Sequence, residues 1–242
     1  MRRSKGPSGP KAVKRHPIFA VFRALFRLAF PRHRFVGLES VPDKPSVFVC
    51  NHAGIYGPIA MAACFSRRFR PWVKSNTCSI KTARAQVEHD LFGDKTGAVR
   101  LWCRIVSALI APITVALMIG VGAIPIYGDV RVVTTFRESV RTLQAGISLV
   151  IFPENEEPYS EYTHGFSSGF VHVGRNFCAE TGAGLDFFPV YVSKKTRTIN
   201  IGAPVAYLPE RDFTEQRAQV ADALRDAITR IARELEEDGK EG

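Results

Sequence analysis

Paired cysteines are the first feature that this sequence lacks. Its five cysteines stand at positions 50, 64, 78, 103 and 178, and no two of them form a CxxC pair. Because their number is odd and their spacing matches no common set of metal ligands, the sequence argues against a disulfide framework and against a zinc site. We therefore expect no bound metal and a reducing compartment.

Acidic residues are scarce relative to basic ones. Lys and Arg number 33 and Asp and Glu 23, which gives a formal net charge of +10. This surplus implies an anionic partner: nucleic acid, a phosphorylated small molecule or the acidic face of a membrane. The sequence holds no recognised nucleic-acid-binding module, and its basic residues concentrate in a Phe-rich N-terminal region. We therefore expect membrane lipids, and no nucleic acid, as the partner.

The N-terminal region lacks the small-residue cleavage site of a secretion signal. Residues 1–15 carry six basic side chains among Pro, Gly and Ser, which predicts a solvated basic tail. Residues 16–34 predict an amphipathic membrane-associating helix, peripheral or monotopic at the cytoplasmic face of the membrane. The alternative is a first helix packed on the core. The side chains that give this pattern are Phe19, Phe22, Phe26, Phe30, Arg23, Arg27, Arg32 and Arg34.

Charge is absent from residues 105–127, a stretch long enough to cross a bilayer. Pro112, Gly120, Gly122 and Pro125 interrupt it and argue against one continuous spanning helix. The pattern predicts a buried or membrane-dipping helix to about residue 119, followed by a strand at 123–127. A transmembrane helix is the alternative.

The rest of the chain alternates short apolar runs with helical patterns, and it shows no internal repeat. We expect interior strands at 46–50, 147–152 and 186–192, edge strands at 198–201 and 204–206, and a helix at 134–144. Apolar residues from 220 to 235 recur every three or four positions, which predicts a C-terminal amphipathic helix. Alternating strands and helices predict an α/β fold, a layered sheet flanked by helices, in one domain over residues 35–242.

A histidine follows the first of these strands in the stretch CNHAGIYGP, residues 50–58. Residues 46–50 are apolar and β-branched, so Asn51 and His52 are expected at the carboxyl end of a buried strand. Open α/β sheets place their chemistry at this edge. The alternative for His52 is a core histidine with a purely structural role.

Four blocks follow one another along the chain: Asn51-His52, residues 122–126 (GAIPI), residues 152–154 (FPE) and residues 188–190 (FPV). In order and spacing they resemble the phospholipid/glycerol acyltransferase superfamily, which includes 1-acylglycerol-3-phosphate acyltransferases. The resemblance implies a glycerol-phosphate acyltransferase-like fold. It also implies transfer of a fatty acyl group from acyl-CoA or acyl carrier protein to a lipid hydroxyl, with His52 as general base and no cofactor beyond the thioester donor.

Three places depart from the superfamily's motifs. The aspartate five residues after the histidine is Gly57 here, and the arginine that grips the acceptor's phosphate is Gly128. Asn155, Glu156 and Glu157 stand where the third block normally reads Gly-Thr-Arg. Because a glutamate inverts the charge preference of an arginine site, we expect an acceptor without a phosphate there. An amine, a sugar hydroxyl or a neutral glycolipid would suit.

Loss of the aspartate should spare the helix that follows. Pro58 suits a first helical turn, so we expect Gly57 to be the N-cap, where glycine costs about a few tenths of a kcal/mol relative to aspartate. The candidates to replace the carboxylate beside His52 are Glu154 and Glu156. We expect His52 and Glu154 to be catalytic. The expected substrate-binding residues are Asn51, Tyr56, Gly57, Asn155, Glu156 and Glu157.

Two rival functions use other features of the sequence. The missing motif residues would suit a lipid-binding protein that keeps the acyltransferase fold without turnover. Residues 165–169 read GxSxG, the pattern of a hydrolase nucleophile elbow, which must follow a strand and precede an acid and a histidine. The only later histidine is His172, and no acid lies before it, so the sequence favours acyl transfer over hydrolysis.

Overall fold

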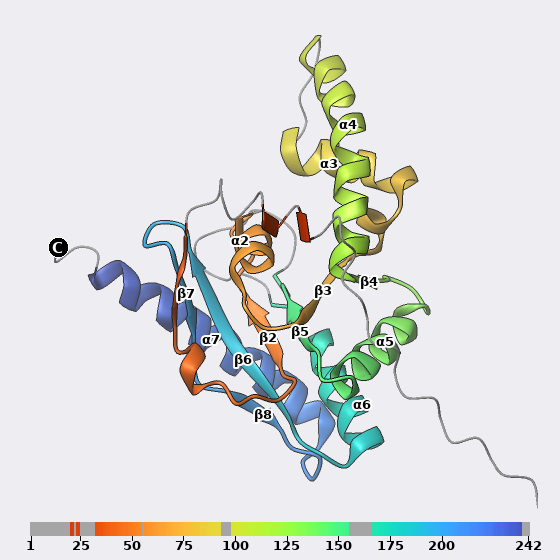
Figure 1. The fold of residues 1–242 in the computed structure, drawn as a ribbon. Helices are drawn as coiled ribbons and strands as arrows, with labels where there is room; N and C mark the ends of the chain where they lie inside the picture. Colours follow the sequence, from red (N-terminus) through yellow and green to blue (C-terminus); the bar gives the residue numbers. More distant parts are fainter. Residues whose placement is uncertain are drawn as a thin grey trace, which may run out of the picture.

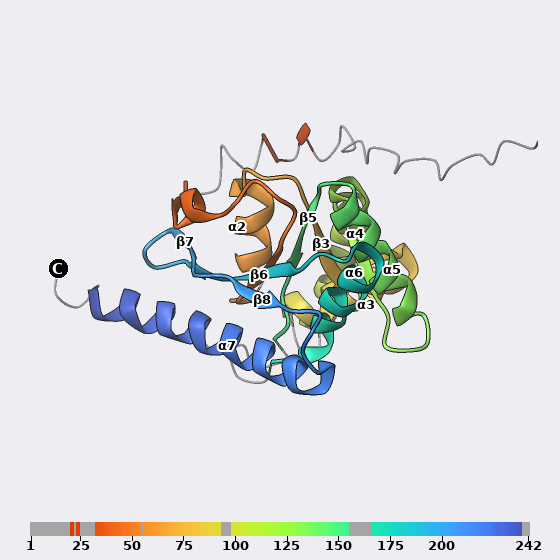
Figure 2. The same ribbon diagram turned by 90° about the horizontal axis from the view of Figure 1, so that it is seen from below.

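A computed structural model describes residues 20–21, 23–24, 32–54, 56–92, 98–154 and 166–238. Their strands form one eight-stranded sheet with helices on both faces (Figure 1, Figure 2). The prediction of a layered α/β sheet flanked by helices is confirmed.

The order of strands across the sheet is β1-β7-β6-β2-β5-β3-β4, and β8 pairs with β6. The pairs formed by β6, β2, β5, β3 and β4 are parallel, whereas β7 and β8 run antiparallel to β6. The carboxyl ends of the parallel strands therefore meet at one edge. The strands are β1 Arg34–Val36, β2 Val47–Cys50, β3 Phe69–Lys74, β4 Ile124–Ile126, β5 Ser148–Ile151, β6 Leu185–Ser193, β7 Thr198–Ile201 and β8 Val205–Tyr207.

Helices connect most of these strands and cover the sheet. In Figure 2, α7 lies below the sheet and α2 above it. The helices are α2 Tyr56–Cys64, α3 Ile80–Phe92, α4 Ala98–Val121, α5 Val132–Gln144, α6 His172–Thr181 and α7 Phe213–Asp238, with short 3-10 turns at Leu38–Ser40, Ser75–Cys78 and Ser168–Val171.

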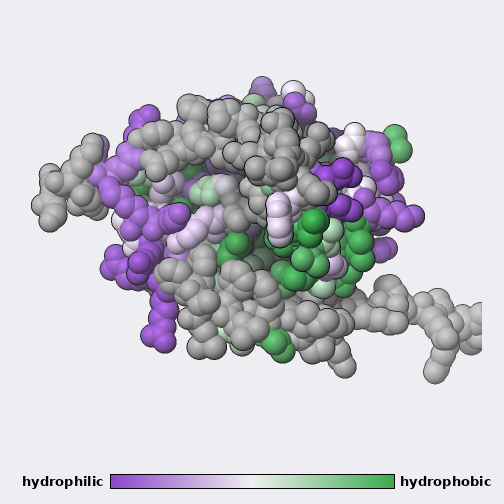
Figure 3. Space-filling view, turned by 90° about the horizontal axis from the view of Figure 1, so that it is seen from above, coloured by the Kyte–Doolittle hydropathy of each residue, from purple (hydrophilic) through white to green (hydrophobic). Residues whose placement is uncertain are grey.

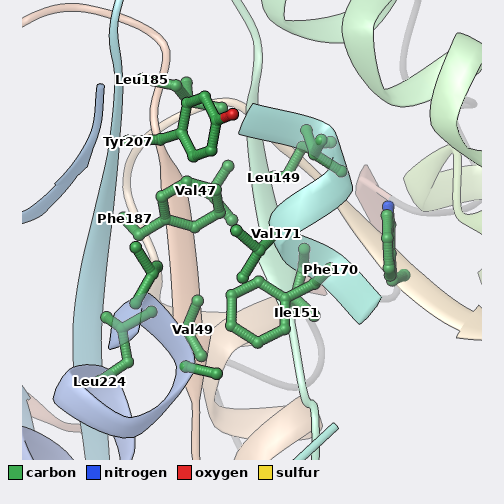
Figure 4. Close-up of a cluster of buried hydrophobic side chains, with 14 of the residues drawn as sticks. Val47, Val49, Leu149, Ile151, Phe170, Val171, Leu185, Phe187, Tyr207 and Leu224 are labelled. Atoms are coloured by element: carbon green, nitrogen blue, oxygen red, sulfur yellow. The ribbon is translucent and has the colours of Figure 1, made fainter. Parts of the chain in front are cut away.

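Two apolar clusters bury the two faces of the sheet. Val47 and Val49 point toward α7, where Leu224 is fully buried against them (Figure 4). Phe48 and Cys50, which alternate with them along β2, point to the opposite face and pack under α2. Alternate side chains of a strand face opposite sides, so β2 is buried on both and reads as a continuous apolar run.

Several predicted elements match, and one placement is wrong. Strands β2, β5 and β6 and helices α5 and α7 lie where they were expected. The strand at 198–201, expected at an edge, is β7, and it lies between β1 and β6. The error arises because β1 has only three residues, Arg34–Val36, too few to show an alternating pattern.

The N-terminal prediction is tested only in part, because residues 1–19, 22 and 25–31 lie outside the described residues. Residues 20–21 and 23–24 are helical, but Arg34–Val36 is strand β1, so the expected helix end at residue 34 is wrong. The Arg23 guanidinium donates to the carbonyl oxygens of Ala63 (3.3 Å) and Phe65 (2.6 Å), at the end of α2. This contact favours the alternative, a first helix packed on the body.

Candidate active site at the carboxyl edge of β2

His52 and Glu154 come together because the strands that precede them are neighbours. β2 pairs with β5 in parallel, with Val49 opposite Ile151, so the residues that follow both strands emerge at the same edge. The aromatic ring of Phe152 meets the His52 ring edge-on, with centroids 5.5 Å apart. The edge predicted from the strand pattern is therefore the one that the fold builds.

The His52 ring is held by the backbone of the turn that follows it. Its Nδ1 is hydrogen-bonded to the carbonyl oxygen of Gly54. A carbonyl oxygen can only accept, so Nδ1 of the neutral ring carries the proton and Nε2 is the basic nitrogen. The turn brings this carbonyl round through two positive φ angles, 46° at Ala53 and 63° at Gly54. This backbone carbonyl is a contact of the ring that the sequence did not point to.

Gly57 occupies a position with no room for a side chain. A Cβ atom there would lie 2.6 Å from the His52 carbonyl oxygen and 2.7 Å from that of Asn51. Its own N–H donates to the His52 carbonyl oxygen over 3.2 Å. Because α2 already begins at Tyr56, Gly57 lies inside the first turn, and its assignment as N-cap is wrong. In this backbone, an aspartate at position 57 would collide with the segment that carries the histidine.

Glu154 supports the backbone of His52. Its Oε2 accepts the His52 N–H over 2.9 Å. Burial of the carboxyl raises the pKa of Glu154 to about 7, and the hydrogen bond from the His52 backbone partly opposes that rise. Burial, and then the charge of Glu154, raise the pKa of the neighbouring Cys50 thiol. Glu154 therefore changes its charge near neutral pH, beside the histidine.

Asn51 and Tyr56, both expected to bind substrate, have contacts within the scaffold. The Asn51 side chain accepts from the Val192 N–H (2.7 Å) and donates to the Val192 carbonyl oxygen (3.3 Å), so it joins the ends of β2 and β6. The Tyr56 hydroxyl lies 2.8 Å from His33 Nε2, and burial raises the pKa of Tyr56. Both residues position the segment around His52, and their roles toward a substrate stay predictions.

The remaining expected pocket residues lie outside the described residues. These are Asn155, Glu156 and Glu157, in the stretch from 155 to 165.

Gly128 stands where the superfamily carries a phosphate-binding arginine. It is exposed and has no side chain. Arg131, three residues further on, forms an ion pair with Asp129 (2.7 Å) and lies over the Tyr127 ring at 4.5 Å. Hydrogen bonds from Arg131 lower the pKa of Asp129 to about 2. The cation nearest in sequence to the lost arginine is thus paired within its own loop.

Lys74 is a basic residue of this edge that the sequence analysis missed. It is the last residue of β3, opposite Ile126 of β4, and β3 is the next strand beyond β5. A lysine at the end of the run FRPWVK was the available signal.

The structure gives no support to the nucleophile elbow. Ser167 follows an isolated bridge residue, Phe166, and its N–H donates to the Pro153 carbonyl oxygen over 3.0 Å. His172 packs between the Phe136 and Phe213 rings, at 5.4 and 4.6 Å between centroids, and burial lowers its pKa. A nucleophile elbow requires a serine directly after a β-strand, and among the described residues Ser167 does not follow one.

Among known proteins, a similar fold occurs in the crystal structure of the 1-acyl-sn-glycerophosphate (LPA) acyltransferase PlsC from Thermotoga maritima. The match has a TM-score of 0.56 and 15% sequence identity, and it covers 91% of this chain and 78% of that chain. No family model and no curated protein sequence matches the chain. At this level of identity the similarity shows a shared fold, so the chemistry has to be argued from the site.

Proposed function

We propose that this protein is a membrane-associated acyltransferase of the phospholipid/glycerol type. It transfers a fatty acyl group from acyl-CoA or acyl carrier protein to a lipid hydroxyl, with His52 as general base. The observation that carries the proposal is the contact between His52 Nδ1 and the Gly54 carbonyl oxygen, at the carboxyl edge of β2. The shared fold with a PlsC acyltransferase supports the reaction class.

The reaction needs one base and no covalent enzyme intermediate. His52 Nε2 takes the proton of the acceptor hydroxyl, and the oxygen attacks the thioester carbonyl carbon. The tetrahedral intermediate then collapses, the C–S bond breaks, and the imidazolium returns the proton to the departing sulfur. The products are an ester and a free thiol. A positioned general base contributes a factor of about 10² to 10⁴ to such a step.

The Gly54 carbonyl supplies part of what a carboxylate partner would. It fixes the orientation and tautomer of the ring, as the aspartate of a serine-protease triad does. It carries no full charge, so it stabilises the imidazolium less than a carboxylate. Glu154, bound to the His52 backbone N–H, is the nearby group that can add negative charge once it ionises. We expect slower turnover than in a histidine–aspartate site, and higher turnover above neutral pH.

We propose an acceptor that presents no phosphate group to the region of Gly128. The internal pairing of Arg131 with Asp129 supports this, because that loop offers a phosphate no net positive charge. A monoacylglycerol or a neutral glycolipid would fit. Acylation of lysophosphatidic acid at a rate that Glu157→Arg leaves unchanged would rule out this acceptor class.

The alternative function is lipid binding without turnover. The close contacts of Gly57 favour it, because they exclude a carboxylate at the position where the superfamily carries one.

The test is thiol release from palmitoyl-CoA in the presence of monoacylglycerol or lysophosphatidic acid. His52→Ala should lower the rate by about 10²- to 10⁴-fold. The control, His172→Gln, changes a histidine outside the site and should keep the rate. If wild-type protein releases no thiol with any acceptor, and wild type and His52→Ala bind the lipids equally, the protein binds lipid without turnover.

A further inference from the structure

Helix α4 is apolar on two sides, but it packs on a neighbouring helix with only one of them. Cys103, Ser107, Ala111 and Val115 are buried, and the last two pack against α3. On the opposite side a stripe of large apolar side chains faces solvent. We call this stripe the α4 outer face; its residues and exposed fractions are Trp102 (70%), Ile105 (46%), Leu109 (67%) and Ile113 (55%).

The outer face is a continuous stripe. At 3.6 residues per turn its four side chains fall within an arc of about 80°, and they extend along about 16 Å of the helix. Within Trp102–Val121, a window of 18 residues has a mean hydropathy of 2.1, and only 28% of that window is buried. A core helix of such composition would be mostly buried, because a helix that is apolar all round needs an apolar environment on every side.

Helix α4 extends beyond the edge of the sheet that carries His52. The chain leaves β3 at its carboxyl end, passes through α3 and α4, and enters β4 at its amino end, so the first half of α4 lies beyond the carboxyl edge (Figure 1). Figure 3 looks at the molecule from above, from the side toward which α4 extends. It shows a group of exposed hydrophobic residues with hydrophilic residues to the left and right.

Basic side chains of the α3–α4 pair lie on the α3 side of α4, away from the outer face, and the formal net charge of +10 of the whole chain favours an anionic surface. The Arg84 guanidinium of α3 donates to the Arg104 carbonyl oxygen of α4 over 3.2 Å, and both arginine side chains are exposed. Trp102 belongs to the outer face, and tryptophan is enriched at the boundary between lipid headgroups and acyl chains. Because Arg84 and Lys81 of α3 belong to the same helical pair, α4 suits a position lying along the bilayer surface rather than crossing it.

We propose that the α4 outer face is the surface by which this protein docks on a bilayer with anionic headgroups. This inference rests on the proposed function for the reason why a lipid surface is needed, and it names the element that meets the lipid. Because the first half of α4 lies beyond the carboxyl edge of the sheet, docking of this face holds that edge near the bilayer surface, where a lipid acceptor is available to His52.

The chain carries its own reporter for this contact, because it has two tryptophans. Trp102 is exposed, whereas Trp72 is buried and donates to Ser139 Oγ over 2.8 Å. With vesicles of phosphatidylcholine and phosphatidylglycerol, the emission of the full chain should shift to the blue and be quenched by brominated acyl chains. Trp102→Phe should abolish both effects. Sedimentation of the protein with these vesicles without either effect would overturn the proposal.

A matched pair of substitutions tests the apolar contact. Leu109→Asp should weaken vesicle binding at least about 10-fold, because it removes a leucine that inserts among the lipids and adds a charge. Val133→Asp, on α5, changes another exposed apolar residue (56%) and should leave binding unchanged. Equal losses in the two variants, or none in Leu109→Asp, would overturn the proposal. So would a concentration-dependent dimer that Leu109→Asp abolishes, because the face would then bind a second copy.

Docking and catalysis can be told apart. Leu109→Asp should keep its turnover on a detergent-dispersed acceptor, whereas His52→Ala should lose turnover and keep vesicle binding. Docking without any turnover in wild-type protein would refute the proposed function alone.

Discussion

At the scale of single residues, the turn after β2 accounts for the unusual geometry of the candidate site. Ala53 has a φ of 46°, in a region where a residue other than glycine is strained by about 1 kcal/mol or more. This conformation turns the Gly54 carbonyl toward the His52 ring and brings the next helix close enough to touch the histidine backbone. Glycine is then the only residue type that fits at position 57. The missing carboxylate and the carbonyl partner are two consequences of one backbone path.

The first prediction is that restoring the superfamily's aspartate does not restore a dyad. Gly57→Asp should lower the free energy of unfolding by about 1–3 kcal/mol, because its Cβ overlaps two carbonyl oxygens. Turnover should fall with it. Urea unfolding measures the first effect and thiol release the second. Gly128→Asp is the control for stability, since a Cβ at that position meets nothing within 4 Å. Faster turnover in Gly57→Asp would contradict the carbonyl account.

The second prediction concerns Glu154 and pH. Its pKa of about 7 in the folded protein lies above the ordinary value of 4.5, so the folded state binds the proton more tightly than the unfolded state. The stability that this gives is complete below about pH 4.5 and is lost as pH rises to about 7. A glutamine at this position does not titrate and can still accept the His52 N–H. Glu154→Gln should therefore gain stability relative to wild type between these pH values, by up to about 3 kcal/mol.

Unfolding by urea at pH 5 and pH 8 measures this difference. A gain of the same size at both pH values would show that Glu154 does not titrate between them.

At the scale of elements, the parallel strands were predictable and the turn between them was not. β2, β5 and β6 are buried on both faces, so each leaves an apolar run, and parallel pairing then places His52 and Glu154 at one edge. The Gly54 contact depends on the φ of Ala53, for which alanine gives no signal. Strand β3, with Arg70 and Pro71 inside it, has no clean alternation, and it was missed for that reason.

Arg70 links three elements at the base of the α3–α4 pair. From β3 it donates to the Gly122 carbonyl oxygen before β4, and to Glu138 (2.6 Å) and Thr142 (2.9 Å) of α5. Its side chain is 12% exposed. Arg70→Met should lower the free energy of unfolding by about 2–3 kcal/mol, since it leaves these acceptors without their charged donor.

Arg137→Met, at an exposed position of α5, is the control and should change the free energy of unfolding by no more than about 0.5 kcal/mol. Equal effects of the two substitutions would show that the Arg70 contacts contribute little.

At the scale of the whole molecule, the net charge and the apolar face point to the same partner. In the proposed docking, apolar side chains on α4 contact acyl chains, and the surplus of 10 positive charges attracts an anionic surface from a distance. Composition alone predicted the anionic partner but left its class open. The exposed stripe on α4 favours a membrane, because a row of apolar side chains binds acyl chains, whereas nucleic acid is bound mainly through its charged phosphates.

The last prediction separates these two contributions. Removing residues 1–15 takes away six basic residues and lowers the formal net charge from +10 to +4. Each basic residue near an anionic bilayer contributes up to about 1 kcal/mol, so binding to phosphatidylglycerol vesicles should weaken at least about 10-fold at low salt. The deficit should shrink as salt is added, because screening removes the attraction from the intact chain as well. A chain with residues 1–15 in scrambled order keeps the charge and should bind like wild type. If the truncated chain binds as tightly as the intact one at low salt, the basic tail takes no part in membrane attraction, and the rest of the chain with the α4 outer face is sufficient.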